Sequence, residues 1–267
     1  KIEELKKNNF LNSFLCLFFL ILCCYIRYYY CLFSLYYLFF FYQKINKRYF
    51  FLLLLISFIL SLPAIFYFYY IFLNSNFSNT VINYSQINFY SNSLIILSIL
   101  LFYLFPFIFL QRRPFLTYLR ENKKIIITIF LIFLILYLID QFLNFNLINF
   151  SPKGGGVFVK IANIFNINQL LVLSITSYLS LITLDYFFKG KRLQNYSLLI
   201  FLIISFPIYT IYQKYFDPLF FLLFFGLVKS NKIENIFLKN RVFLFTIASY
   251  FSIFYLFSLM YYKGNFY

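Results

Sequence analysis

The sequence predicts an all-α fold, a polytopic transmembrane bundle of about nine membrane segments in a single integral membrane domain over residues 1–267. Of its residues, 63% are hydrophobic and 11% are charged, and the mean hydropathy is +0.83. Soluble domains do not bury that much apolar surface. Apolar stretches of about 17–25 residues recur along the chain, and this length crosses a hydrocarbon core about 30 Å thick. Both observations indicate a membrane protein.

The first apolar stretch, residues 10–42, contains one charged side chain, Arg27. It is too long for one membrane helix and short for two standard ones. A break at Arg27 predicts two short helices, 10–26 and 28–42, which form a hairpin with Arg27 at its turn. Basic residues precede and follow this hairpin, so both of its ends are expected on the same side of the membrane.

Hydropathy predicts seven further segments, and the loops between them differ strongly in charge. The segments are 49–73, 93–110, 125–140, 168–187, 196–212, 215–228 and 242–262. Alternation from the N-terminus places 18 of the 23 Lys and Arg residues on one side. The loops of that side are 1–9, 43–48, 111–124, 188–195 and 229–241. The positive-inside rule makes this side, with the N-terminus, cytoplasmic, and the membrane would be a bacterial inner membrane or the endoplasmic reticulum.

The composition also narrows the possible chemistry. The net charge of +16 is accounted for by the basic loops, so no nucleic-acid partner is expected. The chain has no histidine, which excludes Ser–His and Cys–His nucleophile pairs. Its four cysteines match no zinc spacing, and no metal or other cofactor is predicted. The chain starts at Lys1 without Met or a signal peptide, and an N-terminal part is expected to be missing.

Most of the unusual polar residues fall on the predicted exterior side, beside breaks between helices. They are Arg27 at the hairpin turn, Asp140 at the end of a segment, Lys153 and Lys160 around Gly154, Gly155 and Gly156, and Lys214, Tyr215 and Asp217 between two segments. Charges beside a membrane are costly unless they are used or paired. The simpler interpretation is that the basic residues snorkel to the interface and the acidic ones end helices. On the inner side, Asp185 is interpreted as an interfacial residue beside Lys189.

The three consecutive glycines have two interpretations that the sequence leaves open. They form either a flexible linker or a backbone that a ligand approaches closely. The apolar pattern of 157–165 predicts a short interfacial helix directly after them. A glycine-rich turn that leads into a helix N-terminus, with a lysine on each side, is a physically sound phosphate site. The spacing is not that of a Walker loop.

Three short motifs recur in the order known from one family. They are Arg27-Tyr28-Tyr29-Tyr30, the polar stretch from Ser151 to Lys160, and Lys214-Tyr215-Phe216-Asp217-Pro218. In these motifs the chain resembles the GT-C membrane glycosyltransferases that use polyprenyl-phosphate sugars, above all the dolichyl-phosphate-glucose α-1,2-glucosyltransferases and their bacterial relatives. It would be the C-terminal portion of such a protein. The Gln that follows the Arg in the family is absent. The acidic first exterior loop, which holds the general base, is also absent, so that base is expected upstream of Lys1.

The resemblance implies transfer of a sugar from a polyprenyl-phosphate donor to an acceptor hydroxyl on the periplasmic or lumenal face. The expected partners are the lipid-linked sugar donor and membrane lipid. Arg27, Lys153, Lys160 and Lys214 would neutralise the phosphate leaving group. Asp140 or Asp217 would orient sugar hydroxyls, with the three glycines and Tyr215 completing the binding site.

Two other functions remain open from the sequence. A transporter or lipid flippase would use helices broken by glycine or proline near the bilayer midplane, and Pro63, Pro106 and Pro207 offer such breaks. A non-catalytic subunit of an organellar respiratory complex would carry buried Lys and Glu at the centres of its spans. No predicted span has such a charge at its centre.

Overall fold

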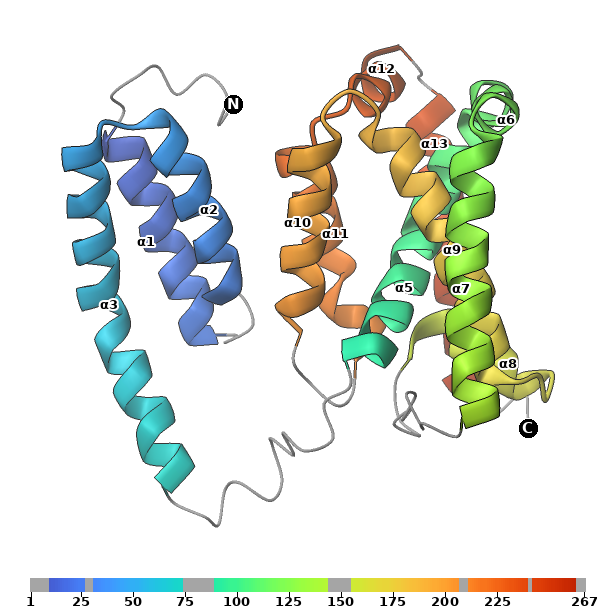
Figure 1. Cartoon of the computed structure of the whole chain (residues 1–267), viewed down its shortest axis with the longest axis horizontal. Helices are drawn as coiled ribbons and strands as arrows, with labels where there is room; N and C mark the ends of the chain where they lie inside the picture. Colours follow the sequence, from blue (N-terminus) through green and yellow to red (C-terminus); the bar gives the residue numbers. More distant parts are fainter. Residues whose placement is uncertain are drawn as a thin grey trace. The chain divides into compact units, whose positions relative to one another are not determined.

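The computed structural model describes residues 10–26, 31–73, 89–143, 155–206, 211–239 and 242–262, and over these residues every regular element is helical (Figure 1). The long or apolar helices are α1 (Phe10–Ile26), α2 (Cys31–Lys44), α3 (Lys47–Leu73), α5 (Phe89–Leu110), α7 (Lys123–Leu143), α9 (Gln169–Phe188), α10 (Arg192–Ile204) and α13 (Val242–Tyr262). The short ones are α6 (Arg112–Glu121), α8 (Gly156–Ile164), α11 (Asp217–Leu222) and α12 (Asn231–Lys239). A 3-10 turn, Gln213–Tyr215, precedes α11, and a π-helical turn, Leu223–Leu227, follows it.

Four of these helices are long and apolar enough to cross a membrane. They are the helices over Lys47–Tyr67, Tyr90–Leu110, Gln169–Phe188 and Phe243–Met260, and Phe10–Tyr25 and Arg192–Ile204 are shorter apolar helices. The predicted helical membrane bundle is therefore supported by the described residues, but the count of nine spans is not. Segments 196–212 and 215–228 show why hydropathy overcounts. α10 already ends at Ile204, and α11 with the π-helical turn reaches only about 16 Å at 1.5 Å per residue.

The chain divides into two compact units, Lys1–Asn92 with Ser197–Tyr209 (unit 1) and Ser93–Tyr196 with Thr210–Tyr267 (unit 2). In unit 1, α1 packs against both α2 and α3. Leu17, Phe41 and Leu53 are buried between these helices, and the Tyr25 hydroxyl donates to the Leu60 carbonyl oxygen at 2.8 Å. α1 and α2 are the two short helices predicted on either side of Arg27, which itself lies outside the described residues.

The core of unit 2 is built on α5 and α9, both mostly buried, whereas α13 is almost entirely exposed. The Ser177 hydroxyl of α9 donates to the Leu94 carbonyl oxygen of α5 at 2.8 Å. Small residues at such crossings allow close approach of two helix backbones. Aromatic rings fill the remaining core, for example Phe220 and Phe224, which stack at 4.5 Å between ring centroids. The exposed apolar surface of α13 matches the lipid-facing side of a membrane helix.

Loops that the sequence assigns to the same side meet at the same end of unit 2. At one end, Gln111 Nε2 donates to the Lys232 carbonyl oxygen at 3.4 Å, and Asn195 Nδ2 donates to the Lys229 carbonyl oxygen at 3.0 Å. These bonds join the loops 111–124, 188–195 and 229–241. Figure 1 shows α6 and α12 at this end and α8 at the other. The predicted grouping of the unit 2 loops is confirmed, and the assignment of one end to the cytoplasm stays a prediction.

Cysteine labelling tests that assignment. In a chain whose native cysteines are replaced by alanine, Arg113→Cys and Lys191→Cys are expected to react with a membrane-impermeant reagent from the cytoplasmic side, and Lys214→Cys from the opposite side. All three side chains are exposed, and the positive-inside rule orients the basic loops inward. Labelling of Lys191→Cys and Lys214→Cys from one side would contradict the topology.

Candidate functional site

The glycine turn forms the start of α8. Gly155 and Gly156 are buried and have φ of 82° and 77°, in the left-handed region that glycine enters without strain. A Cβ on Gly156 would lie 2.9 Å from Ile99 Cγ1 on α5. Position 156 therefore needs glycine for its backbone angle and for the close approach of α5. Both glycines are packed backbone rather than a linker.

Two amides at the start of α8 donate to acceptors within the protein. The Gly155 N–H donates to the Ile211 carbonyl oxygen at 2.9 Å, and the Val157 N–H donates to Gln213 Oε1 at 3.0 Å. These two bonds tie the start of α8 to the segment that precedes α11. Because these two amides have protein acceptors, anion binding here depends on side chains more than on the helix N-terminus.

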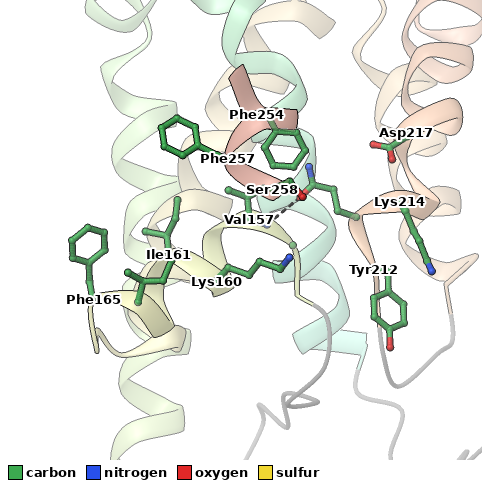
Figure 2. Close-up of a pocket in the computed structure, with 13 residues that line it drawn as sticks. Val157, Lys160, Ile161, Phe165, Tyr212, Lys214, Asp217, Phe254, Phe257 and Ser258 are labelled. Carbon is green, nitrogen blue, oxygen red and sulfur yellow. Dashed lines mark hydrogen bonds between the residues drawn. The ribbon is translucent and has the colours of Figure 1, made fainter. Parts of the chain in front are cut away.

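A pocket of about 670 Å³ lies between α8, the segment before α11, and α13 (Figure 2). Its apolar walls come from Ile161, Ile164 and Phe165 after the glycine turn and from Phe254 and Phe257 of α13. Its polar groups come from Lys160, Tyr212, Gln213, Lys214, Asp217 and Ser258. A concave apolar site of this size with a few convergent polar groups is typical of small-molecule pockets.

The charged groups of the pocket are two lysines and one carboxylate. Lys160 projects from α8, and Lys214 lies on the 3-10 turn with its Nζ 5.2 Å from the centroid of the Tyr212 ring. Asp217 begins α11, where a carboxylate interacts favourably with the helix dipole, and it accepts a hydrogen bond from the Tyr103 hydroxyl of α5. Figure 2 shows Lys214 and Asp217 on the side of the pocket opposite Phe257 and Phe165, with Lys160 between the two sides.

Comparison of the chain with family models, curated proteins and solved structures gives no match. The resemblance to the GT-C glycosyltransferases therefore stays a prediction. The structure contributes the geometry of the pocket, which is independent of that resemblance.

The structure brings together about half of the predicted site residues. Gly156, Lys160, Lys214 and Asp217 line the pocket, and Gly155 is hydrogen-bonded beside it. The glycine turn and the stretch around Lys214 therefore converge in space. Tyr215 ends the 3-10 turn and Asp140 lies in the last turn of α7, but neither side chain is described. Arg27, Lys153 and Gly154 lie outside the described residues.

Sequence reasoning missed the wall that α13 contributes. Phe254, Phe257 and Ser258 lie in an apolar helix, whose uniform hydrophobicity gives no sign of which face meets a pocket. Tyr103, the partner of Asp217, is hidden in the same way within α5. The one available signal was Gln213, a polar residue directly before the predicted Lys214 motif.

A second polar cluster, centred on Asp185, lies at the opposite end of unit 2. Asp185, interpreted from the sequence as an interfacial residue beside Lys189, is only 4% exposed and pairs with Arg192. Its carboxylate accepts from Arg192 Nη2 at 2.8 Å, from the Tyr196 hydroxyl at 2.9 Å and from the Tyr118 hydroxyl. A buried carboxylate needs such partners because desolvation otherwise disfavours its charge. The cluster joins α6, α9 and the start of α10.

Lys232 of α12 extends this cluster. Its Nζ lies 3.3 Å from the centroid of the Tyr186 ring and donates to the Tyr186 carbonyl oxygen at 2.9 Å, which is a close cation–π arrangement. Burial and the positive charge of Lys189 lower the pKa of Lys232 to about 8, against opposing effects of Asp185 and Glu121. Burial and the hydrogen bond to Asp185 raise the pKa of Tyr118, so this phenol remains a donor. Neither this cluster nor any other part of the described chain groups three or more His, Cys, Asp or Glu residues for a metal ion.

Proposed function

We propose that this chain is the donor-lipid-binding part of a membrane glycosyltransferase, which moves a sugar from a polyprenyl phosphate to an acceptor hydroxyl. The observation that carries the proposal is the pocket itself. Lys160 and Lys214, predicted separately as phosphate-binding residues, line one cavity whose walls are otherwise mostly apolar. An amphiphile with an anionic head and a hydrocarbon tail fits that combination better than a polar metabolite does.

The lysines supply the charge that the leaving group requires. When the bond between the anomeric carbon and the phosphate oxygen breaks, the phosphate gains negative charge, the acceptor oxygen bonds to that carbon, and the acceptor hydroxyl passes its proton to a general base. Two ammonium groups held beside it stabilise the developing charge without a metal ion. Lys214 is held near the Tyr212 ring, and Lys160 is carried by the helix whose start is bonded to Gln213.

Asp217 would orient the sugar. Its carboxylate lines the pocket with the lysines and is held by the Tyr103 hydroxyl. A carboxylate accepts up to about four hydrogen bonds, so one bond from Tyr103 leaves acceptor positions for sugar hydroxyls. Gly156 serves the site by letting α8 start against α5, and Gly155 leaves room for the Val159 side chain.

In this proposal the pocket faces the periplasm or the lumen. The opposite end of unit 2 carries the basic loops, which the positive-inside rule retains in the cytoplasm. The proposal keeps α1 and α2 as a short hairpin with Arg27 at its tip and the N-terminus in the cytoplasm.

A lipid transporter is the second candidate, and one observation favours it. α11 and the π-helical turn form a short interrupted helix that begins at the pocket with Asp217. Transporters place such interrupted helices at their binding sites. Movement of a fluorescent polyprenyl phosphate between leaflets, without sugar transfer, would favour this candidate.

Neutralising both pocket lysines is expected to weaken binding of a short polyprenyl monophosphate by about tenfold or more, which is about 1.4 kcal/mol. Binding of the matching polyprenol, which lacks the phosphate, should stay unchanged in Lys160→Gln/Lys214→Gln. The measurement is native mass spectrometry of the purified full chain. Lys124→Gln removes an exposed lysine at the start of α7 and serves as the control. Equal retention of phosphate and polyprenol by the wild type would contradict the proposal.

A further inference from the structure

The end of unit 2 opposite the pocket has a strongly unbalanced surface charge. This end, here called the basic end, is made by α6, the start of α7, the α9–α10 turn and α12. Eight of its described side chains are exposed and basic: Arg112, Arg113, Arg120, Lys123, Lys124, Lys189, Lys191 and Arg192. Glu121 is the exposed acidic side chain among those described there, since Asp185 is buried and paired. Such an excess of positive charge attracts a polyanion.

Part of the positive charge of the basic end lies on α6, a helix that crosses the bundle. In Figure 1, α6 is seen nearly end-on while α7 is seen from the side. α6 is amphipathic: Tyr118 is buried, and the Phe115 ring packs edge-on against Tyr186 at 5.3 Å between centroids. Arg112 and Arg113 are consequently left on its exposed surface. The hydrogen bond from Tyr118 to Asp185 holds this orientation.

Apolar side chains stand among these cations. Leu193, next to Arg192, is 89% exposed, and Leu116 on α6 is 44% exposed. A soluble polyanion gains little from an exposed leucine. A bilayer surface gains from both groups, because apolar side chains enter the acyl boundary while the cations meet the headgroups.

We propose that the basic end binds the headgroups of anionic phospholipids in the leaflet that it faces. The helix ends of α7 and α9 place this surface where a membrane helix leaves the hydrocarbon core. Each basic side chain near an anionic leaflet contributes attraction that decays within a Debye length. α6 lies along the interface, with its cations toward headgroup phosphates and with Leu116 and Leu193 toward the acyl chains. This binding is independent of what the pocket holds.

The test compares lipid selectivity in reconstituted full-length protein. Vesicles contain phosphatidylcholine with a minor fraction of phosphatidylglycerol, and spin-labelled forms of each lipid report how many are immobilised by the protein. Wild type is expected to favour phosphatidylglycerol, and added salt should reduce that preference. Arg112→Gln/Arg113→Gln should lower the preference at least about fivefold, the effect of one basic side chain at an anionic surface.

The control variant is Lys47→Gln/Arg48→Gln, which removes two exposed charges at the start of α3 in unit 1. It should leave most of the preference in place. An equal loss in both variants would overturn the proposal, because net charge alone would then explain it. Unchanged preference in Arg112→Gln/Arg113→Gln, with loss of binding to a short single-stranded RNA, would assign the surface to a soluble polyanion instead. If that variant fails to fold, Lys189→Gln/Lys191→Gln applies the same criteria to the α9–α10 turn.

Discussion

Asp185→Ala is expected to lower the free energy of unfolding by about 2–4 kcal/mol. The substitution removes the acceptor of three hydrogen bonds, from Tyr118, Arg192 and Tyr196. Tyr118 is buried, so its hydroxyl loses its partner where water does not replace it. Arg192 contributes less to the loss, because its side chain is 44% exposed and is rehydrated when the carboxylate is gone.

The measurement is the unfolding of the purified chain in mixed detergent micelles. Glu121→Ala is the matched control, because it removes an exposed carboxylate from the same end of unit 2 and should stay within about 0.5 kcal/mol of wild type. Asp185→Asn, which keeps the shape and one oxygen acceptor, should fall between the two. If Asp185→Ala were no more destabilising than Glu121→Ala, the Asp185 cluster would not hold α6, α9 and α10 together.

Gly156→Ala is expected to destabilise the chain and to lower polyprenyl-phosphate binding, because the added methyl group meets two obstacles. A φ of 77° costs an L-residue about 1–2 kcal/mol. The Cβ would also lie 2.9 Å from Ile99 Cγ1, so α8 has to shift away from α5. That shift weakens the bond between the Val157 N–H and Gln213, which links α8 to the lysine of the 3-10 turn.

Two other glycines separate these obstacles. Gly190 has a φ of 113° with no atom within 4 Å of its added Cβ, and Gly226 has open space without a positive φ. Gly190→Ala should therefore lose stability by backbone strain alone, and Gly226→Ala should be nearly neutral. The unfolding midpoint is expected to be highest for Gly226→Ala, lower for Gly190→Ala and lowest for Gly156→Ala. Binding of the polyprenyl phosphate should fall only in Gly156→Ala, and an equal fall in Gly190→Ala would contradict the link between the glycine turn and the pocket.

The sequence predicted the long helices well because a membrane helix requires a continuous apolar run, which hydropathy detects. α9 (Gln169–Phe188) and α13 (Val242–Tyr262) follow the predicted segments 168–187 and 242–262 within about a residue. The same signal failed for 215–228, which starts at the last residue of a 3-10 turn and continues through a short helix and a π-helical turn. Hydropathy does not detect such changes of backbone geometry, so it predicted a single membrane helix over 215–228.

The candidate site was predictable where polar residues interrupt apolar sequence and hidden where they do not. Lys160, Lys214 and Asp217 stand out against their neighbours, and the structure places all three at one pocket. Phe254 and Phe257 do not stand out, because every face of α13 is apolar. The partners of Asp185 were missed for a different reason. Packing brings these partners to Asp185 from α6 and α10. The sequence suggested the nearby Lys189 instead, and the described contacts show no bond between Lys189 and Asp185.

The exposure of the apolar pocket wall has a kinetic consequence. Phe257 lines the pocket and is 58% exposed on the outer surface of α13, and Phe165 and Ile164 are exposed in the same way on the α8 side. For the polyprenyl phosphate of the proposed function, these exposed walls imply entry sideways from the bilayer, by diffusion in two dimensions, with the tail never crossing water. Occupancy then follows the mole fraction of the lipid in the membrane rather than its concentration in solution. A short-chain analogue dissolved in buffer must first partition into the bilayer, so its apparent affinity reports chain length as much as it reports contacts in the pocket.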